Sequence, residues 1–383
     1  MDAVTRLLSD LVAIPSVNPM GRGLSGPGIG EGGMSDYLEG WFRDLGVAVE
    51  RRAAAAGRDN VIARYEAPRR GRTILFDAHQ DTVPTDGMTI DPFRPEVRDG
   101  RLHGRGSCDV KGGMAAMLVA FARLVRERPG DSASVVMACT VDEEFTHVGS
   151  SLLARDVRGF DLGIVAEPTK LDIVDAHKGA VRWKVRTRGV ACHSSTPELG
   201  DNAIYRMAGV VSALAEYARS LADAPSSPRL GRQTLSVGRI EGGTSVNVVP
   251  DRAEIEIDRR LNGMEPPVGP EAEVEAFLRG RLGDLDGVEF LPPFVRMPAL
   301  LPIRDDPRLA PLKAAIARVG GREPEVLGVP YGTDAGPLAE AGLPCFVFGP
   351  GDIAQAHTKD EWIDLDQLRL GSEMYFEIAR AWD

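Results

Sequence analysis

The feature that most constrains the fold is an alternation of short apolar runs with a helical segment between residues 73 and 167. A segment rich in Ala, Leu and Met, residues 114–127, has the composition of a crossover helix. Four apolar runs have the length of buried strands, at residues 73–76, 134–141, 161–165 and 344–348. Strands that alternate with helices in this way predict an α/β domain with a parallel sheet.

The middle of the chain has the pattern of a second, smaller domain. Apolar and basic residues alternate from Val181 to Arg188, which is typical of a strand with one wet face. Helices are then expected at 202–219 and 271–282, and further strands at 234–240, 253–261 and 288–291. The order strand–helix–strand–strand–helix–strand is that of a ferredoxin-like α+β domain. We therefore expect a discontinuous catalytic domain, residues 1–178 and 293–383, with residues 179–292 inserted.

Composition and charge exclude several classes of protein. With 45 Lys and Arg against 56 Asp and Glu in 383 residues, the net charge of −11 argues against nucleic acid and anionic membranes as partners. No apolar run approaches the roughly 18 residues of a membrane span. The 4 cysteines contain no C-x-x-C pair, so neither a disulfide framework nor a zinc ribbon is expected. A cytoplasmic protein fits these features best.

Acidic residues and histidines follow the predicted strands. His79 and Asp81 come after the first strand, residues 142–144 (DEE) after the second, Glu167 after the third and His357 after the last. Ligand sites of open α/β sheets lie beyond the carboxyl ends of the strands. Any one of these residues alone is more often surface or core filler, but burying all of them together without cations would be costly. A metal site is the economical interpretation.

The types of donor indicate which ions would bind. Two imidazoles with the carboxylates of Asp109, Glu144 and Glu167, and no thiolate, suit zinc, cobalt or manganese. Two divalent ions against three carboxylates leave a charge of +1, which a bridging hydroxide would neutralise. A binuclear centre, with ions roughly 3.5–4 Å apart, activates water and polarises a carbonyl.

Two further acids suit supporting roles. Glu143 is next to a candidate ligand but is free itself, so it could act as general base and acid. Asp81, two residues after His79, points the same way along an extended chain and is suited to hold His79 in its ligating tautomer.

Five motifs, taken together, resemble a known family. They are residues 79–84 (HQDTVP), 104–113 (GRGSCDVKGG), 142–144 (DEE), 166–169 (AEPT) and 356–358 (AHT). In this order, over nearly the whole chain, they resemble the co-catalytic zinc amidohydrolase and metallopeptidase family of acetylornithine deacetylase, succinyl-diaminopimelate desuccinylase and glutamate carboxypeptidase. The resemblance implies a zinc-exopeptidase-like catalytic domain with a mixed, mainly parallel sheet, and an inserted ferredoxin-like dimerisation or lid domain.

The resemblance also implies a role for each ligand. Asp109 would bridge two divalent ions, with Zn²⁺ expected and Co²⁺ or Mn²⁺ able to substitute, and Glu143 would be the catalytic base. The bond after Asp109 is cis in relatives, so a cis Asp109–Val110 bond is expected. The remaining ligands fall into two pairs, His79 with Glu167 and Glu144 with His357.

The inserted domain carries the residues expected on the substrate side. Residues 189–195 (GVACHSS) resemble a segment whose histidine, here His193, reaches the partner subunit's active site and steadies the oxyanion, so a homodimer is expected. Asn247 and Arg260 match positions that contact the substrate, although the turn after Arg260 departs from the family's pattern and leaves Arg259 as an alternative. Gly332 and Thr333, followed by Asp334, resemble a substrate-side loop.

These features predict a two-metal hydrolase that cleaves the amide bond of an N-acyl amino acid, or as an alternative that of a dipeptide or peptide C-terminus. Glu167, where aminopeptidase branches carry Asp, favours deacylases and carboxypeptidase-like members. Two alternatives belong to other classes. One is a cysteine hydrolase that uses Cys108 or Cys192, and the other is a metal-free binding protein of the same fold.

The other histidines and one glycine-rich motif are interpreted as structural. His103, His147 and His177 match no ligand motif. Cys108 is interpreted as a buried thiol that serves only in packing. Residues 21–26 (GRGLSG) satisfy G-x-G-x-x-G but follow no strand, so a flexible loop is expected rather than a dinucleotide site.

Overall fold

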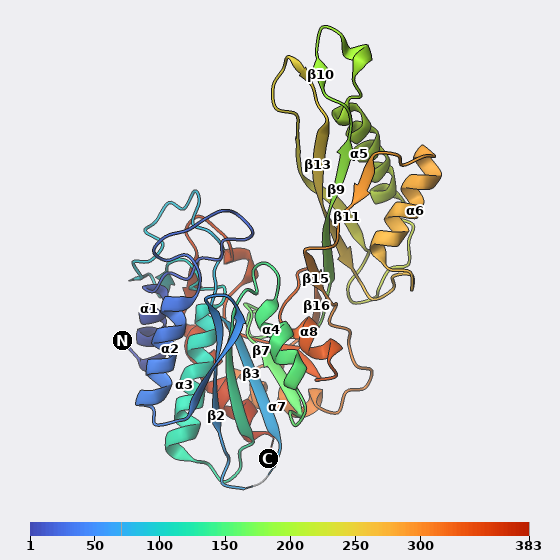
Figure 1. The fold of residues 1–383 in the computed structure, drawn as a ribbon. Helices are drawn as coiled ribbons and strands as arrows, with labels where there is room; N and C mark the ends of the chain where they lie inside the picture. The colour runs from blue at the N-terminus through green and yellow to red at the C-terminus, as the bar shows by residue number, and fades with distance from the viewer. Residues whose placement is uncertain (70, 383) are drawn as a thin grey trace. The chain divides into compact units, whose positions relative to one another are not determined.

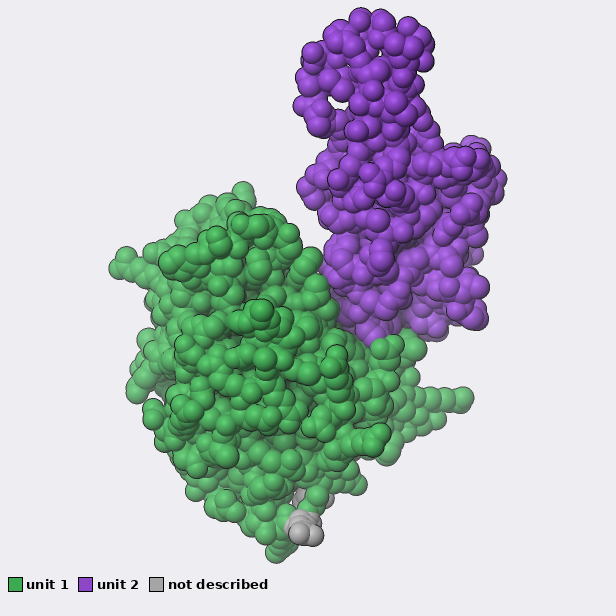
Figure 2. Space-filling model, in the orientation of Figure 1, with its two compact units in different colours: residues 1–176, 300–328, 333–383 green, residues 177–299, 329–332 purple. Residues whose placement is uncertain are grey.

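The computed structural model describes residues 1–69 and 71–382, which divide into two compact units (Figure 2). Unit 1 contains the described residues among 1–176, 300–328 and 333–383, and unit 2 contains 177–299 and 329–332. Each unit has its own apolar core. The division after unit 2 falls later than the expected residue 292, because β15 (Val295–Met297) pairs with β9 (Gly179–Arg188) and so belongs to unit 2.

Unit 1 is built on an eight-stranded mixed sheet (Figure 1). Its strands, in spatial order, are β1 (Val49–Ala55), β2 (Arg58–Tyr65), β6 (Ser134–Thr140), β3 (Thr73–His79), β7 (Leu162–Val165), β17 (Cys345–Val347), β8 (Ile173–His177) and β16 (Val326–Val329). The four central strands from β6 to β17 are mutually parallel. The pairs β1–β2, β2–β6 and β8–β17 are antiparallel. Every side chain of β3 and β6 is buried, which accounts for their continuous apolar runs.

Helix α3 (Lys111–Glu127) links the site loop to the core of unit 1, packing against β3 and β6 and against two further helices. It begins at Lys111 rather than at 114, so that Gly112 and Gly113 lie in its first turn. A Cβ at Gly112 would come within 2.5 Å of the Ser107 carbonyl oxygen, so this close approach requires glycine. The other helices of unit 1 are α1 (Ala3–Val12), α2 (Gly32–Asp44), α4 (Val148–Leu153), α7 (Leu309–Gly320), α8 (Ala335–Glu340) and α9 (Leu365–Arg380).

A small three-stranded sheet completes unit 1. It consists of β4 (Glu96–Arg98), β5 (Arg101–His103) and β18 (Trp362–Asp364), with β5 in the middle. Because β18 pairs with β5, the segment after His357 lies beside the loop that leads to Asp109. Sequence reasoning missed this sheet, as it missed β1 and β2. Three-residue strands carry almost no periodic signal, and β1 is rich in Ala and Arg, of which Ala is depleted in strands.

Unit 2 has the predicted split βαβ topology, which confirms the expected fold class. Strands β11, β13, β9 and β14 lie in that spatial order, and β9 carries β15 as well. This places the second strand of the motif at one edge and the fourth at the other. Its elements are β9, α5 (Ala203–Ser220), β11 (Thr234–Gly242), β13 (Arg252–Leu261), α6 (Pro270–Leu282) and β14 (Val288–Phe290), with a two-stranded sheet of β10 (Cys192–His193) and β12 (Val248–Val249).

Two observations bear on earlier expectations. The Asp109–Val110 peptide bond is cis, as the resemblance implied.

Within the described part of the chain, no helix combines the length and apolar character that crossing a membrane requires.

Candidate metal centre

The predicted ligands meet at the carboxyl ends of the central parallel strands of unit 1. His79 is the last residue of β3, Glu144 follows β6 by four residues and Glu167 follows β7 by two. Asp109 lies just before α3, and His357 lies on the segment between β17 and β18. The parallel register of β3 with both β6 and β7 brings these loops to one edge of the sheet.

Asp109 belongs to two groups of possible ligands at once. His79, Asp109 and Glu167 form one group, and Asp109, Glu144 and His357 form the other, with the donor atoms of each group within 4.8 Å of one another. Asp109 Oδ1 lies 3.2 Å from His79 Nε2, and Asp109 Oδ2 lies 3.3 Å from His357 Nε2. Each oxygen of one carboxylate therefore faces a different imidazole. This is the arrangement that a bridging ligand requires, and the donor set fits two divalent ions.

The site concentrates negative charge in a buried place. Burial raises the pKa of Glu167 well above its ordinary value, and Asp109 adds to the rise, although His79 opposes it. Burial likewise raises the pKa of Glu144. The pKa values of the two imidazoles also rise, but for a different reason. Burial disfavours charged His79, but Asp109, Glu143 and Asp81 outweigh it and raise the His79 pKa well above its usual value. Hydrogen bonds with Asp109 and Glu144 raise the pKa of His357 to about 11. Cations would relieve this crowding.

Asp81 contacts His79 in a different way from the one expected. His79 Nδ1 lies 2.9 Å from the backbone carbonyl oxygen of Asp81, whereas the nearer carboxylate oxygen is 3.7 Å away. The carboxylate instead accepts the backbone N–H groups of Glu143 at 3.2 Å and Glu144 at 3.1 Å. The residue thus fixes the ring through its main chain, and its side chain fixes the segment that carries the candidate base and a candidate ligand.

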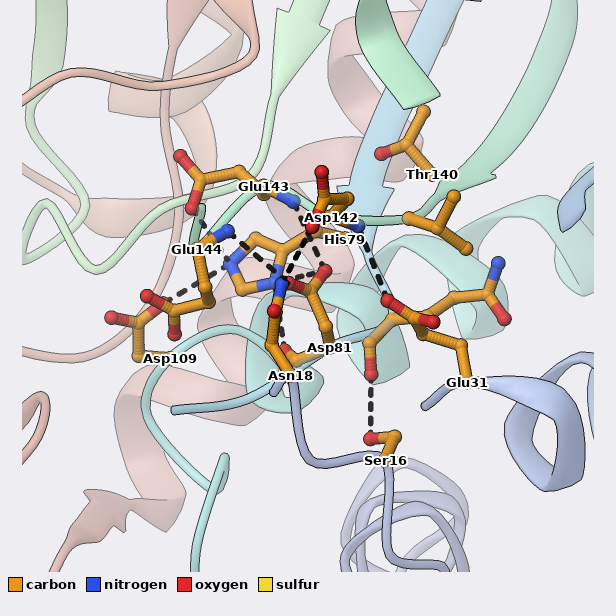
Figure 3. Close-up of polar contacts among 12 residues, drawn as sticks. Ser16, Asn18, Glu31, His79, Asp81, Asp109, Thr140, Asp142, Glu143 and Glu144 are labelled. Carbon is orange, nitrogen blue, oxygen red and sulfur yellow. Dashed lines mark hydrogen bonds and ion pairs between the residues drawn. The ribbon is translucent and has the colours of Figure 1, made fainter. Parts of the chain in front are cut away.

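The carboxylate of Asp81 also belongs to a buried polar network that sequence reasoning missed (Figure 3). The amide nitrogen of Asn18 donates to Asp81 at 2.7 Å and to Asp142 at 2.9 Å. Arg58 donates to Asp142 at 2.5 Å and also pairs with Glu31, whose side chain is fully buried. One amide therefore joins the segment after β3 to the segment after β6. In the sequence, the only sign of this network was Asp142, the acidic residue before Glu143. Nothing in the sequence indicated that Asn18 would bind to it.

Glu361 is a second residue that sequence reasoning missed. Its buried carboxylate accepts the backbone N–H groups of Gly106, Cys108 and Asp109 at 3.0, 2.9 and 3.0 Å, and the guanidinium of Arg105 at 2.7 Å. Four donors to one carboxylate hold the loop that carries Asp109. Glu361 follows His357 by only four residues, so one segment supplies a candidate ligand and supports another.

Glu143 lies beside the two groups without belonging to either. Its side chain is buried, and its Oε2 lies 4.0 Å from His79 Nε2. Burial raises the pKa of Glu143 well above its ordinary value, an effect that Glu167, Asp334 and Glu144 strengthen and His79 opposes. A carboxylate that takes up a proton readily suits a general base.

Comparison with known proteins identifies the family. The profile of peptidase family M20/M25/M40 matches residues 75–381. This chain belongs to that family. It is 32% identical to the acetylornithine deacetylase of Erwinia tasmaniensis over 364 residues, which cover 90% of this chain and 89% of the relative. It is 29% identical to a peptidase M20 domain-containing protein of Schizosaccharomyces pombe over 347 residues, or 89% of this chain and 78% of the relative.

Solved structures share the M20 fold. An M20 family metallo-carboxypeptidase from Sulfolobus solfataricus, 19% identical, superposes with a TM-score of 0.80 over 100% of this chain and 99% of the other. A dinuclear metal binding peptidase from the M20 family of Bacillus subtilis, 18% identical, has a TM-score of 0.64 over 98% of this chain and 96% of the other. The predicted family is confirmed, and so is the reaction class of a metal-dependent amidohydrolase.

The substrate-side residues predicted for this M20 chain lie mostly in unit 2. His193 on β10 pairs with Val248 on β12, and the Ser194 N–H donates to the Asn247 carbonyl oxygen at 3.1 Å, so His193 and Asn247 are neighbours. Both are exposed. Gly332 also belongs to unit 2, whereas Thr333 belongs to unit 1 and is buried, with its hydroxyl accepting the Ala335 N–H at 3.1 Å.

The structure separates the two candidate arginines. Arg259 is fully buried in unit 2, where it contacts Gln233 and Tyr217 and packs among core residues. Arg260, on the opposite face of β13, is partly exposed and pairs with Asp258 at 2.7 Å. Of the two, only Arg260 presents its guanidinium to solvent.

The thiols give no support to a cysteine hydrolase. Cys108 is buried and donates to the Asp352 carbonyl oxygen at 3.3 Å, and burial raises its pKa well above the ordinary value. The Cys192 thiol donates to the Thr196 carbonyl oxygen at 3.4 Å, while the neighbouring imidazole of His193 pairs with Ser195 at 2.7 Å. Neither contact activates a thiolate.

Ligand substitutions predict distinct metal contents. Asp109→Asn removes the carboxylate shared by both groups, so we expect neither ion to bind tightly. His357→Ala removes a ligand of one group only, and the variant should keep roughly one of about two ions. Metal content after zinc loading and gel filtration, measured by inductively coupled plasma mass spectrometry, tests this. The exposed Asp91→Asn is the control. Equal contents in Asp109→Asn and His357→Ala would contradict a shared ligand.

Proposed function

We propose that this M20 chain hydrolyses the amide bond of an N-acyl amino acid with two divalent metal ions, Zn²⁺ being preferred and Co²⁺ or Mn²⁺ able to substitute. The observation that carries the proposal is the pair of ligand groups that share Asp109, with the free carboxylate of Glu143 beside them. Several relatives at 30–32% identity, over 86–90% of this chain, carry the name acetylornithine deacetylase, which supports an N-acyl amino acid over a peptide.

The chain's own residues divide the chemistry among them. When bound, the ions would activate water and polarise the carbonyl of the scissile amide. Glu143 takes the proton of the attacking water at Oε2, the oxygen nearer His79, and passes it to the leaving nitrogen. The ions would be held by His79, Asp109, Glu144, Glu167 and His357. Asp81 keeps the Glu143–Glu144 segment in place.

Removal of the base should separate catalysis from metal binding. Glu143→Ala is expected to lower kcat by about 10²–10⁴-fold, because proton transfer is lost while all five predicted ligands remain. Hydrolysis of N-acetylornithine, N-succinyl-diaminopimelate, other N-acyl amino acids and dipeptides would be measured alongside metal content, with the exposed Glu340→Ala as control. Near-normal turnover by metal-loaded Glu143→Ala would refute the mechanism. A preference for dipeptides would refute the substrate class alone.

Arg260 and Asn247 are proposed to bind the substrate's carboxylate. Arg260 is partly exposed and Asn247 is exposed, whereas Arg259 is used within the core of unit 2. A guanidinium binds a carboxylate with two parallel hydrogen bonds, and hydrogen bonds to charged groups contribute about 1.5–3 kcal/mol.

The two arginine variants should therefore fail in different ways. Arg260→Ala is expected to raise KM by roughly 10- to 100-fold with little loss of thermal stability. Arg259→Ala should instead lower the melting temperature, because it removes a buried partner of Gln233 and Tyr217. Steady-state kinetics and calorimetry distinguish the two. A rise in KM confined to Arg259→Ala would overturn the assignment.

The chain is proposed to act as a homodimer through unit 2, with His193 of the partner subunit completing each site. One end of unit 2 exposes large apolar side chains that a second copy would cover: Val190, Leu199, Ile204, Tyr205, Ile240 and Val246. Tyr205 is 78% exposed and Val246 100% exposed, which is unusual for residues of their size. Ile204, at the start of α5, lies close to Gly242 and Gly243 at the end of β11, so these side chains belong to neighbouring elements.

Mixed dimers test the contribution of His193. His193→Ala and Glu143→Ala should each be nearly inactive, but a hybrid of the two contains one intact site. Equal amounts, unfolded and refolded together, should recover roughly a quarter of the wild-type activity if hybrids form at random. Analytical ultracentrifugation gives the oligomeric state. Recovery of no activity in a mixture shown to be dimeric would rule out a shared site.

A further inference from the structure

His147, which the sequence assigned to structure, lies beside the candidate base. The loop after β6 turns back at His147, whose φ of 56° is left-handed and whose N–H donates to the Asp142 carbonyl oxygen at 2.7 Å. This turn brings His147 Nδ1 to within 3.9 Å of Glu143 Oε1. His147 is only 6% exposed, so its ring is a fixed part of the wall around Glu143.

Asp334 holds the imidazole of His147. Asp334 Oδ1 lies 3.1 Å from His147 Nδ1 and accepts the Ser150 hydroxyl at 2.5 Å, while Oδ2 accepts the Thr140 hydroxyl at 2.9 Å. Thr140 ends β6 and Ser150 lies in α4, so one buried carboxylate is bound to both ends of the loop that carries Glu143. The acceptor at Nδ1 places the ring proton on that nitrogen, on the edge that faces Glu143.

The two oxygens of Glu143 have different neighbours. Oε2 lies 4.0 Å from His79, on the side of the predicted metal ligands, and Oε1 lies 3.9 Å from His147. Glu143, His147 and Asp334 bring their ligand atoms within 4.8 Å of one another, as a metal group would. Asp334, however, already accepts hydrogen bonds from His147 and Ser150, and it shares the Thr140 hydroxyl with Asp77. These contacts suit a hydrogen-bonding support rather than a third ion.

We propose that His147, oriented by Asp334, is a positioning residue for Glu143: its Nδ1–H attracts Oε1 and leaves Oε2 free to receive the proton of the attacking water. This assignment rests on the proposed function, because it takes Glu143 as the base. The N–H is hydrogen-bonded to Asp334 and lies 3.9 Å from Glu143 Oε1, so its attraction for that oxygen is electrostatic. Such an attraction disfavours rotation of the Glu143 side chain and so keeps the other oxygen aimed at the reacting atoms.

Substitutions at His147 distinguish positioning from packing. His147→Leu keeps the bulk but removes the N–H, and it should lower kcat by about 10- to 100-fold, as loss of a supporting residue does, with KM and metal content nearly unchanged. His147→Asn places an amide N–H near the position of Nδ1 and should recover most of kcat. Ser151→Ala, an exposed substitution in the same helix α4, is the control and should behave like wild type. In a Glu143→Ala background, His147→Leu should have no further effect.

Several results would overturn the proposal. Unchanged kcat in His147→Leu, no recovery in His147→Asn, or an additive loss in the Glu143→Ala background would each show that His147 only fills space. Crystal structures of metal-loaded wild type and His147→Leu provide a test that needs no substrate. In the wild type, Glu143 Oε1 should stay on the side of His147 Nδ1, from which it lies 3.9 Å here, and in the variant it should turn away. A Glu143 turned away from His147, or a third ion between them, would refute the contact even if no tested amide were cleaved.

Discussion

The arrangement of the site depends on one carboxylate that faces two imidazoles. Asp109 presents Oδ1 to His79 and Oδ2 to His357, and the groups around those two histidines share no other residue. Five ionisable side chains drawn from five segments come together here, and all but His357 are largely buried. Cations bound here would offset the repulsion among the carboxylates, and a carboxylate shared between two ions would limit how far apart they lie.

Buried hydrogen bonds hold the loops that carry Asp109 and the neighbouring ligands in position. Glu361 holds the Asp109 loop through three backbone N–H groups, Asp81 holds the Glu143–Glu144 segment, and Asn18 connects Asp81 to Asp142. These supports are buried and polar, and each satisfies main-chain donors or a neighbouring acid. The parallel strands provide the edge on which the loops meet. The hydrogen bonds of Glu361, Asp81 and Asn18 then orient the carboxylates that these loops carry.

The sequence predicted the parts whose signals are local. The buried runs of β3 and β6 and the alternating strand β9 followed from periodicity, and the acids after those strands pointed to the edge of the sheet. The supports could not be predicted in the same way, because Asn18, Glu361 and Asp334 act across long separations in sequence. Asp81 illustrates the limit. Its proximity to His79 was evident, but whether its carbonyl or its carboxylate would make the contact depends on backbone geometry. His147 was set aside because it matches no ligand motif, although its position at a left-handed turn is what brings it to Glu143.

The central claim is that Asp109 bridges two metal ions, and anomalous diffraction from zinc-loaded crystals, recorded on both sides of the zinc absorption edge, tests it most directly. The account predicts two anomalous peaks about 3.5–4 Å apart, each roughly 2.0–2.2 Å from a different oxygen of Asp109. A single peak, or two peaks of which only one contacts Asp109, would contradict it.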